Sequence, residues 1–155
     1  CLKISSEGKI EDIWNEMVVV RLACMYLHGC GCEKDPQKAW YFAQYCIEND
    51  CTYAPRAMTL LGNILHDGRF PKSMTQQEAY CKAVEFYTAS SEKGCKYALF
   101  NLASCYEDGH GVDQQNFRTA LQLYDQAALL GHSTSSVNAK RLLRKIRMAT
   151  MIGNI

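Results

Sequence analysis

The sequence predicts an all-α protein, a solenoid of stacked antiparallel helix pairs, and two observations lead to this fold class. The first is an internal repeat with a period of about 40 residues, which is typical of helical-repeat proteins. The second is that the apolar residues of each copy follow the 3.6-residue period of a helix with one buried face. A single helix pair cannot bury such a face alone, so we expect the copies to share one continuous core.

Three glycines, at intervals of 39 and 41 residues, mark the three copies: Gly29, Gly68 and Gly109. A leucine and a small residue precede each glycine by seven and six positions: Leu22-Ala23, Leu61-Gly62 and Leu102-Ala103. An alanine follows each glycine and opens a second apolar segment: Ala39, Ala83 and Ala120. We therefore expect each copy to be a helix, a turn at the glycine and a second helix, with the small residues at the closest approach of the pair.

The first copy covers residues 10–50 of a single solenoid domain spanning 1–155. Residues 10–20 extend its first helix upstream, and we expect Trp14 to cover the open end of the stack. Its second helix is predicted to start at Asp35-Pro36, because proline is tolerated in a first turn. Asp50 stands where the other two copies have a closing glycine.

The second copy covers residues 54–94 and carries an insertion at 69–80. We expect this insertion to be a protruding loop or an extended helix start. Long connections often have a function, but a neutral insertion is the favoured interpretation here. The third copy covers residues 97–131, with its second helix expected from Phe117 to Leu130.

A basic helix is predicted over residues 133–155, where it caps the last copy with one apolar and one polar face. Its basic residues are Lys140, Arg141, Arg144, Lys145 and Arg147. The favoured interpretation is a solvated capping face. The alternative is a contact with an acidic protein segment, RNA or anionic lipid.

The third copy resembles the Sel1-like repeat, a relative of the tetratricopeptide repeat. The resemblance rests on Ala98, Leu102-Ala103, Tyr106, Gly109-x-Gly111-Val112, Ala120, Tyr124, Ala127-Ala128 and Gly131, and it covers roughly residues 18–132. It implies a right-handed α/α superhelix that acts as a non-enzymatic adaptor or scaffold by binding a protein or peptide partner.

The repeat frame also predicts which residues of the first helices face outward. In related solenoids the first helices line the concave surface, so the resemblance implies that these positions contact a peptide or partner domain. The nine candidates are Arg21, Cys24, His28, Leu60, Asn63, Asp67, Asn101, Ser104 and Asp108. A loop or the convex side is the alternative binding face.

Composition and motifs exclude several other functions. The net charge of +1 indicates no general attraction to nucleic acid or membranes, and no apolar run approaches the length of a membrane span. No catalytic constellation, zinc-ligand spacing or phosphate-binding loop is present. The sequence therefore predicts no enzymatic activity, no cofactor, no metal and no nucleic-acid partner.

The nine cysteines bear on the compartment, because their number is odd and no C-x-x-C pair occurs. This pattern favours reduced structural thiols in an intracellular protein, with a secreted, disulfide-bonded repeat protein as the alternative. The chain begins at Cys1 without a methionine, so we expect it to be part of a longer protein. A regulatory module of a larger enzyme or signalling protein is therefore a second candidate function.

Overall fold

The computed structural model describes residues 16–69 and 74–151, and within them it contains helices and no strands. The helices are α1 (Glu16–His28), α2 (Pro36–Glu48), α3 (Ala54–His66), α4 (Gln76–Glu92), α5 (Lys96–Asp108), α6 (Phe117–Leu129) and α7 (Ser135–Met151). The predicted all-α class is confirmed. The expectations for Trp14 and for the upstream helix extension before Glu16 lie outside the described residues, as does the part of the insertion at 70–73.

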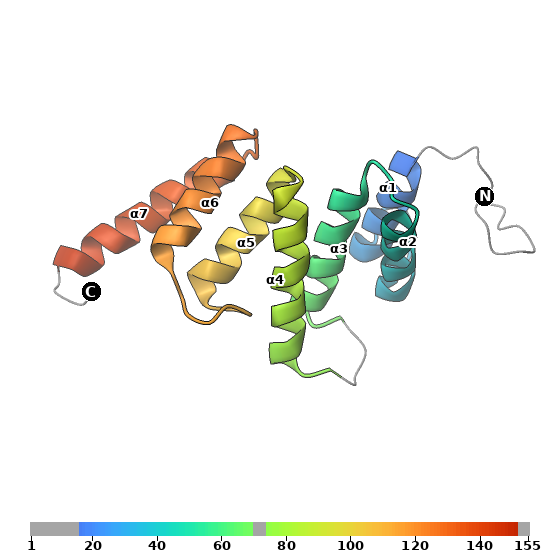
Figure 1. Ribbon diagram of the computed structural model, residues 1–155, viewed down its shortest axis with the longest axis horizontal. Helices are drawn as coiled ribbons and strands as arrows, with labels where there is room; N and C mark the ends of the chain where they lie inside the picture. The colour runs from blue at the N-terminus through green and yellow to red at the C-terminus, as the bar shows by residue number, and fades with distance from the viewer. Residues whose placement is uncertain (1–15, 70–73, 152–155) are drawn as a thin grey trace, which may run out of the picture.

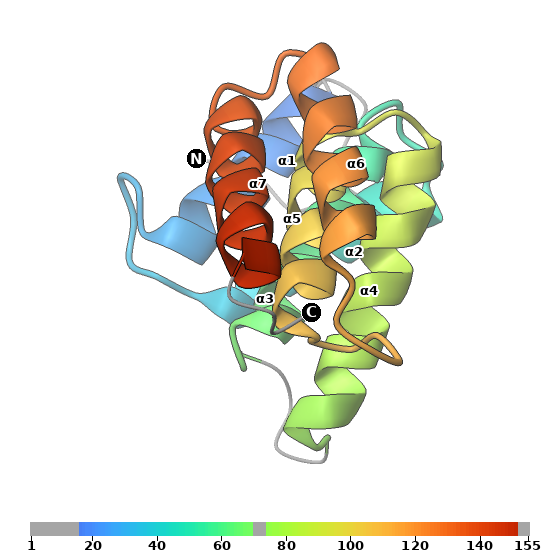
Figure 2. The ribbon, with the colours of Figure 1, turned by 90° about the vertical axis from the view of Figure 1, so that its left-hand side faces the viewer.

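The helices form an elongated stack of two layers, with the first described helix and the last at opposite ends (Figure 1). One layer holds the first helices α1, α3, α5 and α7, and the other holds the second helices α2, α4 and α6 (Figure 2). Each helix packs on the next one in the chain, and α3 also contacts α1 and α5 within its own layer. Contacts between neighbouring elements are the basis of stability in a solenoid.

The core runs through the stack as three buried clusters that share helices. The first cluster joins α1, α2 and α3, the second joins α3, α4 and α5, and the third joins α5, α6 and α7. Because α3 and α5 each contribute to two clusters, the loss of one cluster must affect the helices of the next.

The small residue of each leucine–small pair lies where the two helices of a copy approach closely. The ring of Tyr87 on α4 packs against the α3 backbone at Gly62, where a Cβ atom would lie 2.5 Å from a ring carbon. Ala23 and Ala103 occupy the equivalent positions and are fully buried.

Side-chain caps define where the second helices begin. The Asp35 carboxylate accepts hydrogen bonds from the backbone amides of Gln37 (3.1 Å) and Lys38 (3.0 Å), which starts α2 at Pro36 as predicted. Thr75 and Glu78 form a capping box at the start of α4. Helix α4 has 17 residues, against 13 in each of α2 and α6, so residues 76–80 of the insertion form an extended helix start.

Asp50 adopts the left-handed conformation at the position that glycine occupies in the other copies. Its φ angle is 49°, and the φ angles of Gly94 and Gly131 are 77° and 80°. A side chain is strained in this region, so we expect Asp50→Gly to raise the free energy of unfolding by about 0.5–1 kcal/mol. Urea denaturation measures the change, and Asp50→Ala, which retains a Cβ atom, should show no gain. A less stable Asp50→Gly variant would refute the strain.

Candidate binding surface

The exposed side of α1, α3 and α5, here called the first-helix face, contains most of the predicted contact residues. Arg21, His28, Asp67 and Asp108 are exposed, and Cys24, Asn63, Asn101 and Ser104 are half-buried. Two cavities hollow this face. A polar cavity lies toward the C-terminal ends of α1 and α3 and beside the middle of α5, and a cationic cavity lies toward the N-terminal ends of α3 and α5.

The prediction for Leu60 is wrong. Leu60 is 2% exposed and belongs to the core cluster that joins α1, α2 and α3. Because α3 packs directly against α1, the edge of α3 that carries Leu60 is covered. The equivalent residue of α1, Arg21, is exposed. A leucine side chain is more stable buried against apolar neighbours than exposed to water, so Leu60 packs into the core.

The polar cavity has a volume of about 280 Å³ and brings together five of the predicted residues. Its walls are formed by His28, Asn63, His66, Asp67, Tyr87, Phe100, Asn101 and Ser104, which come from α1, α3, α4 and α5. Three separate copies of the repeat therefore contribute to one small site.

An amide pair spans the polar cavity from α3 to α5. The Asn63 Oδ1 atom accepts hydrogen bonds from the Tyr87 hydroxyl (2.8 Å) and from Asn101 Nδ2 (2.6 Å). Within the described part of the chain, Asn63 Nδ2 and Asn101 Oδ1 have no hydrogen-bond partner, so one amide donor and one acceptor remain available. A peptide unit carries the complementary acceptor and donor.

Two histidines from neighbouring copies meet at this cavity, a pair that was not expected from the sequence. The His66 Nε2 and His110 Nδ1 atoms are 3.4 Å apart, and the Tyr80 ring stacks on His110 with a centroid distance of 4.4 Å. Burial, and next the neighbouring His110, lower the pKa of His66, while Asp67 and Asp108 act in the opposite direction. The one sequence feature that could have indicated this pair is that both histidines lie within two residues of a repeat glycine, His66 before Gly68 and His110 after Gly109.

This lowered pKa predicts that stability falls in mild acid. Because the folded state holds the pKa of His66 below its ordinary value of 6.5, the unfolded chain binds more protons as the pH drops below that value. His132, whose pKa burial also lowers, contributes with the same sign. We expect the free energy of unfolding to decrease from pH 7.5 to pH 5.5, as urea denaturation would measure. The decrease should be smaller for His66→Gln, and an unchanged slope in this variant would contradict the assignment.

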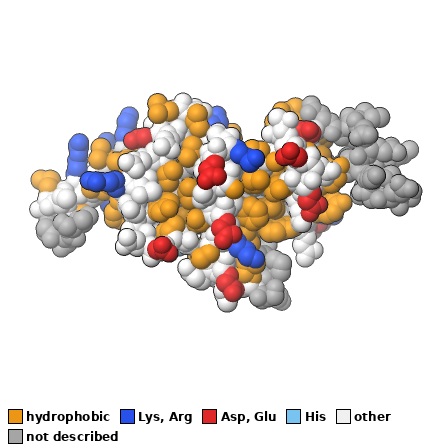
Figure 3. Space-filling view, viewed as in Figure 1, with side chains coloured by type: hydrophobic (Ala, Val, Ile, Leu, Met, Phe, Trp, Pro, Cys, Tyr) orange, Lys and Arg blue, Asp and Glu red, His pale blue; other side chains and the backbone are white. Residues whose placement is uncertain are grey.

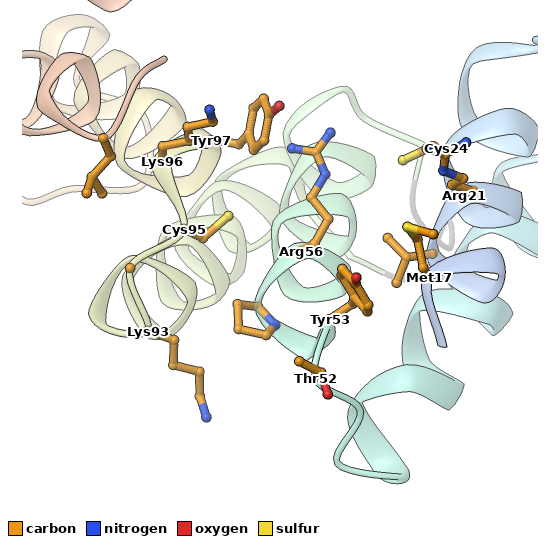
Figure 4. A pocket seen from close by; sticks show the side chains of 14 residues that line it. Met17, Arg21, Cys24, Thr52, Tyr53, Arg56, Lys93, Cys95, Lys96 and Tyr97 are labelled. Carbon is orange, nitrogen blue, oxygen red and sulfur yellow. The ribbon is translucent and has the colours of Figure 1, made fainter. Parts of the chain in front are cut away.

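The cationic cavity is the larger of the two, with a volume of about 640 Å³. Figure 4 shows its lining from α1, from the start of α3 and from the segment that leads into α5. Four of the lining residues are basic, Arg21, Arg56, Lys93 and Lys96, and none is acidic. The predicted residue Cys24 also lines this cavity. Of the four basic residues, only Arg21 was predicted. Arg56 and Lys96 precede the predicted positions of their helices by at least one turn, and Lys93 lies in the connection between α4 and α5.

Cys95 is the N-cap residue that precedes α5, and it lines the cationic cavity. Burial raises the pKa of this thiol, but hydrogen bonds with the Thr59 hydroxyl and with backbone amides outweigh it, and the pKa is lowered. All eight cysteines of the described segments are free.

The basic helix α7 is held to α5 by one of its predicted charges. Arg141 lies 2.7 Å from the Glu107 carboxylate, which is 4% exposed as a residue and also accepts a hydrogen bond from the Tyr124 hydroxyl. Lys145 lies over the Phe117 ring at 4.9 Å. The remaining basic residues, Lys140, Arg144 and Arg147, are exposed near this end of the molecule, where Figure 3 shows a group of Lys and Arg side chains.

Two further findings concern metal binding and membrane crossing. The described residues contain no group of three or more His, Cys, Asp or Glu side chains arranged to hold a metal ion. None of the helices in 16–69 and 74–151 combines the length and apolar character that a bilayer crossing requires.

Comparison with known proteins finds a matching family model and several similar solved structures. The Sel1 repeat model matches residues 19–46, 55–95 and 96–132. A Sel1 repeat protein from Oxalobacter formigenes is 22% identical with a TM-score of 0.59, over 82% of this chain and 89% of that chain. A protective antigen from uropathogenic Escherichia coli that displays an SLR fold is 25% identical with a TM-score of 0.68. The match to this antigen covers 84% of this chain but only 26% of the antigen chain. No curated protein matches.

Proposed function

Since this chain belongs to the Sel1 repeat family, we propose that it is a protein-interaction module that binds an extended segment of a partner on its first-helix face. Sel1 repeat proteins mediate protein–protein interaction, and this chain carries the repeat over most of its length. In the proposal the module works as a non-enzymatic adaptor or scaffold.

The observation that carries this proposal is the polar cavity shared by three copies of the repeat. Asn63 and Asn101 present one free donor group and one free acceptor group there, and the exposed Asp67 carboxylate adds a further acceptor. An extended peptide exposes unpaired backbone N–H and C=O groups along its length, so these amides can bind it irrespective of most of its side chains. Side-chain selectivity must then come from other parts of the face.

Partner capture with paired variants tests the proposal. The test variant combines Asn101→Ala with Asp67→Ala in the full-length protein, and the control combines Gln122→Ala with Asp125→Ala on the exposed side of α6. Both pairs remove one amide and one carboxylate. We expect the test variant to lose a partner that the parent and the control retain, with a dissociation constant raised at least about tenfold.

The control for folding is the melting temperature, which should be similar in both double variants. Equal binding by the test variant and the parent would contradict binding at the polar cavity. Loss of binding in the α6 control alone would place the partner on the second-helix layer.

A further inference from the structure

We propose that the cationic cavity binds an acidic segment that carries a bulky apolar side chain, within the partner that the module recognises. This inference rests on the proposed function and adds the chemical class of the ligand. It concerns the end of the first-helix face opposite to the polar cavity, so the two sites are tested separately.

Unbalanced positive charge is the first argument. Arg21, Arg56, Lys93 and Lys96 line one cavity with no acidic lining residue. Among the described residues none of the four forms an ion pair, since the ion pairs of the described chain involve Lys38, Arg69 and Arg141. Like charges gathered without counter-charges repel one another, and an anionic ligand relieves this repulsion as it binds.

Two of the cations are already held in place. The guanidinium carbon of Arg56 lies 3.6 Å from the centre of the Tyr97 ring, and Figure 4 shows Arg56 directed toward this ring. Lys96 Nζ donates a hydrogen bond to the Gly131 carbonyl at 3.0 Å. Ordering these long side chains before binding lowers the entropy cost of contacting a carboxylate.

Exposed apolar surface lies beside the charges, which is the second argument. Tyr53, Tyr97 and Leu130 line the cavity and are 38%, 39% and 49% exposed. Pro55 and the mostly buried Val20 complete an apolar wall. Aromatic and arginine side chains around a concave site are typical of binding hot spots, and this wall fits an apolar side chain of the ligand.

The shape of the site favours a peptide over a nucleic acid. The cations surround a single cavity of about 640 Å³, a volume typical of sites that enclose side chains or small ligands. Nucleic acid is bound instead by an extended basic surface that follows many phosphates, and the net charge of this chain is only +1.

The two cavities also give the bound segment a direction. The cationic cavity lies at the N-terminal ends of α3 and α5, and the polar cavity, with Asp67, lies at the C-terminal ends of α1 and α3 and beside the middle of α5. A segment that lies along the first-helix face would therefore place its acidic part beside Arg56 and a neutral part beside Asn63.

Selection from a displayed library of random short peptides tests the inference, and it does not require the partner to be identified. The parent protein is used for selection, and binders are then measured against Arg21→Glu combined with Lys93→Glu. Both residues are exposed and neither forms an ion pair within the described chain, so the variant should fold. The matched control combines Arg118→Glu with Lys82→Glu on α6 and α4, which changes the net charge by the same amount.

We expect the selected peptides to contain several acidic residues and at least one large apolar residue. Their binding should weaken at least about tenfold in the test variant, change little in the control, and weaken as ionic strength rises. Neutral or basic binders, no binders, or equal loss in the control would overturn the inference. Binding of a short RNA oligonucleotide with the same dependence on Arg21 and Lys93 would also overturn it.

Failure of this inference is distinguishable from failure of the proposed function. If the partner still depends on Asn101 and Asp67 while acidic peptides do not bind, the module binds its partner without an acidic anchor. If acidic peptides bind the cationic cavity but no partner depends on the polar cavity, the cationic site stands and the proposed site is wrong.

Discussion

Leu102→Asp is expected to lower the free energy of unfolding by about 4 kcal/mol or more, and to unfold helices beyond its own copy. Leu102 is 6% exposed and belongs to the cluster that joins α3, α4 and α5. The substitution removes apolar contacts and places a carboxylate in this cluster. Helix α5 also contributes Ala103 to the next cluster, with α6 and α7, so the damage should extend in both directions.

Urea denaturation gives the magnitude, and amide hydrogen exchange gives its spread along the chain. Protection should fall in α3 and α6 as well as in α5. Leu129→Asp is the matched control, because Leu129 is 86% exposed and its substitution should change stability by no more than about 0.5 kcal/mol. Equal effects of the two substitutions, or loss of protection in α5 alone, would contradict the continuous core.

Gly111→Ala is expected to cost about 3 kcal/mol, from backbone strain and from a steric clash. The φ angle of Gly111 is 70°, which a Cβ atom disfavours. The Cβ atom would also collide with the backbone of Tyr80 and Cys81 in α4, which cannot move as easily as a flexible side chain. The second glycine of the third turn therefore allows the third copy to pack against the second.

Gly94→Ala separates the two contributions. Gly94 has a similar φ angle of 77°, but nothing lies within 4 Å of the position its Cβ atom would take. We expect this control to cost only about 1 kcal/mol, from the backbone conformation alone. Thermal and urea unfolding of both variants measure the difference, and equal costs would show that the approach of α4 is not tight.

The sequence was sufficient for the parts of the fold that depend on local patterns. The leucine–small pairs Leu61-Gly62 and Leu102-Ala103 are buried because their spacing follows the helix period, and Ala23 is buried beside the half-buried Leu22. Asp35 and Pro36 start α2 because capping is a property of a few adjacent residues. Helix α6 ends at Leu129, one residue before the predicted end.

The candidate site was only partly predictable, because it depends on how copies pack on one another. Leu60 was assigned to the surface, but packing of α3 against α1 buries it. The His66–His110 contact joins residues 44 positions apart, and Arg56 meets Tyr97 across two copies. Residue spacing within one repeat carries no information on such pairs, since they depend on the angle and distance between helices.

Glu107 illustrates the same limit. In the sequence it is an ordinary acidic residue before a turn, yet it is buried and binds both Arg141 and Tyr124. Its partners lie on α7 and α6, so the need for a buried carboxylate arises only when the three helices are assembled. The same contact removes Arg141 from the freely available charges of the predicted basic patch.

The measurement that tests the central claim most directly is photo-cross-linking of the full-length protein in its own cells, followed by mass spectrometry. A photoreactive amino acid replaces the exposed His28 at the edge of the polar cavity in one variant and Gln122 on the second-helix layer in another. The account predicts that a protein partner cross-links from position 28 and not from position 122. A partner that cross-links from position 122 and never from position 28 would contradict it.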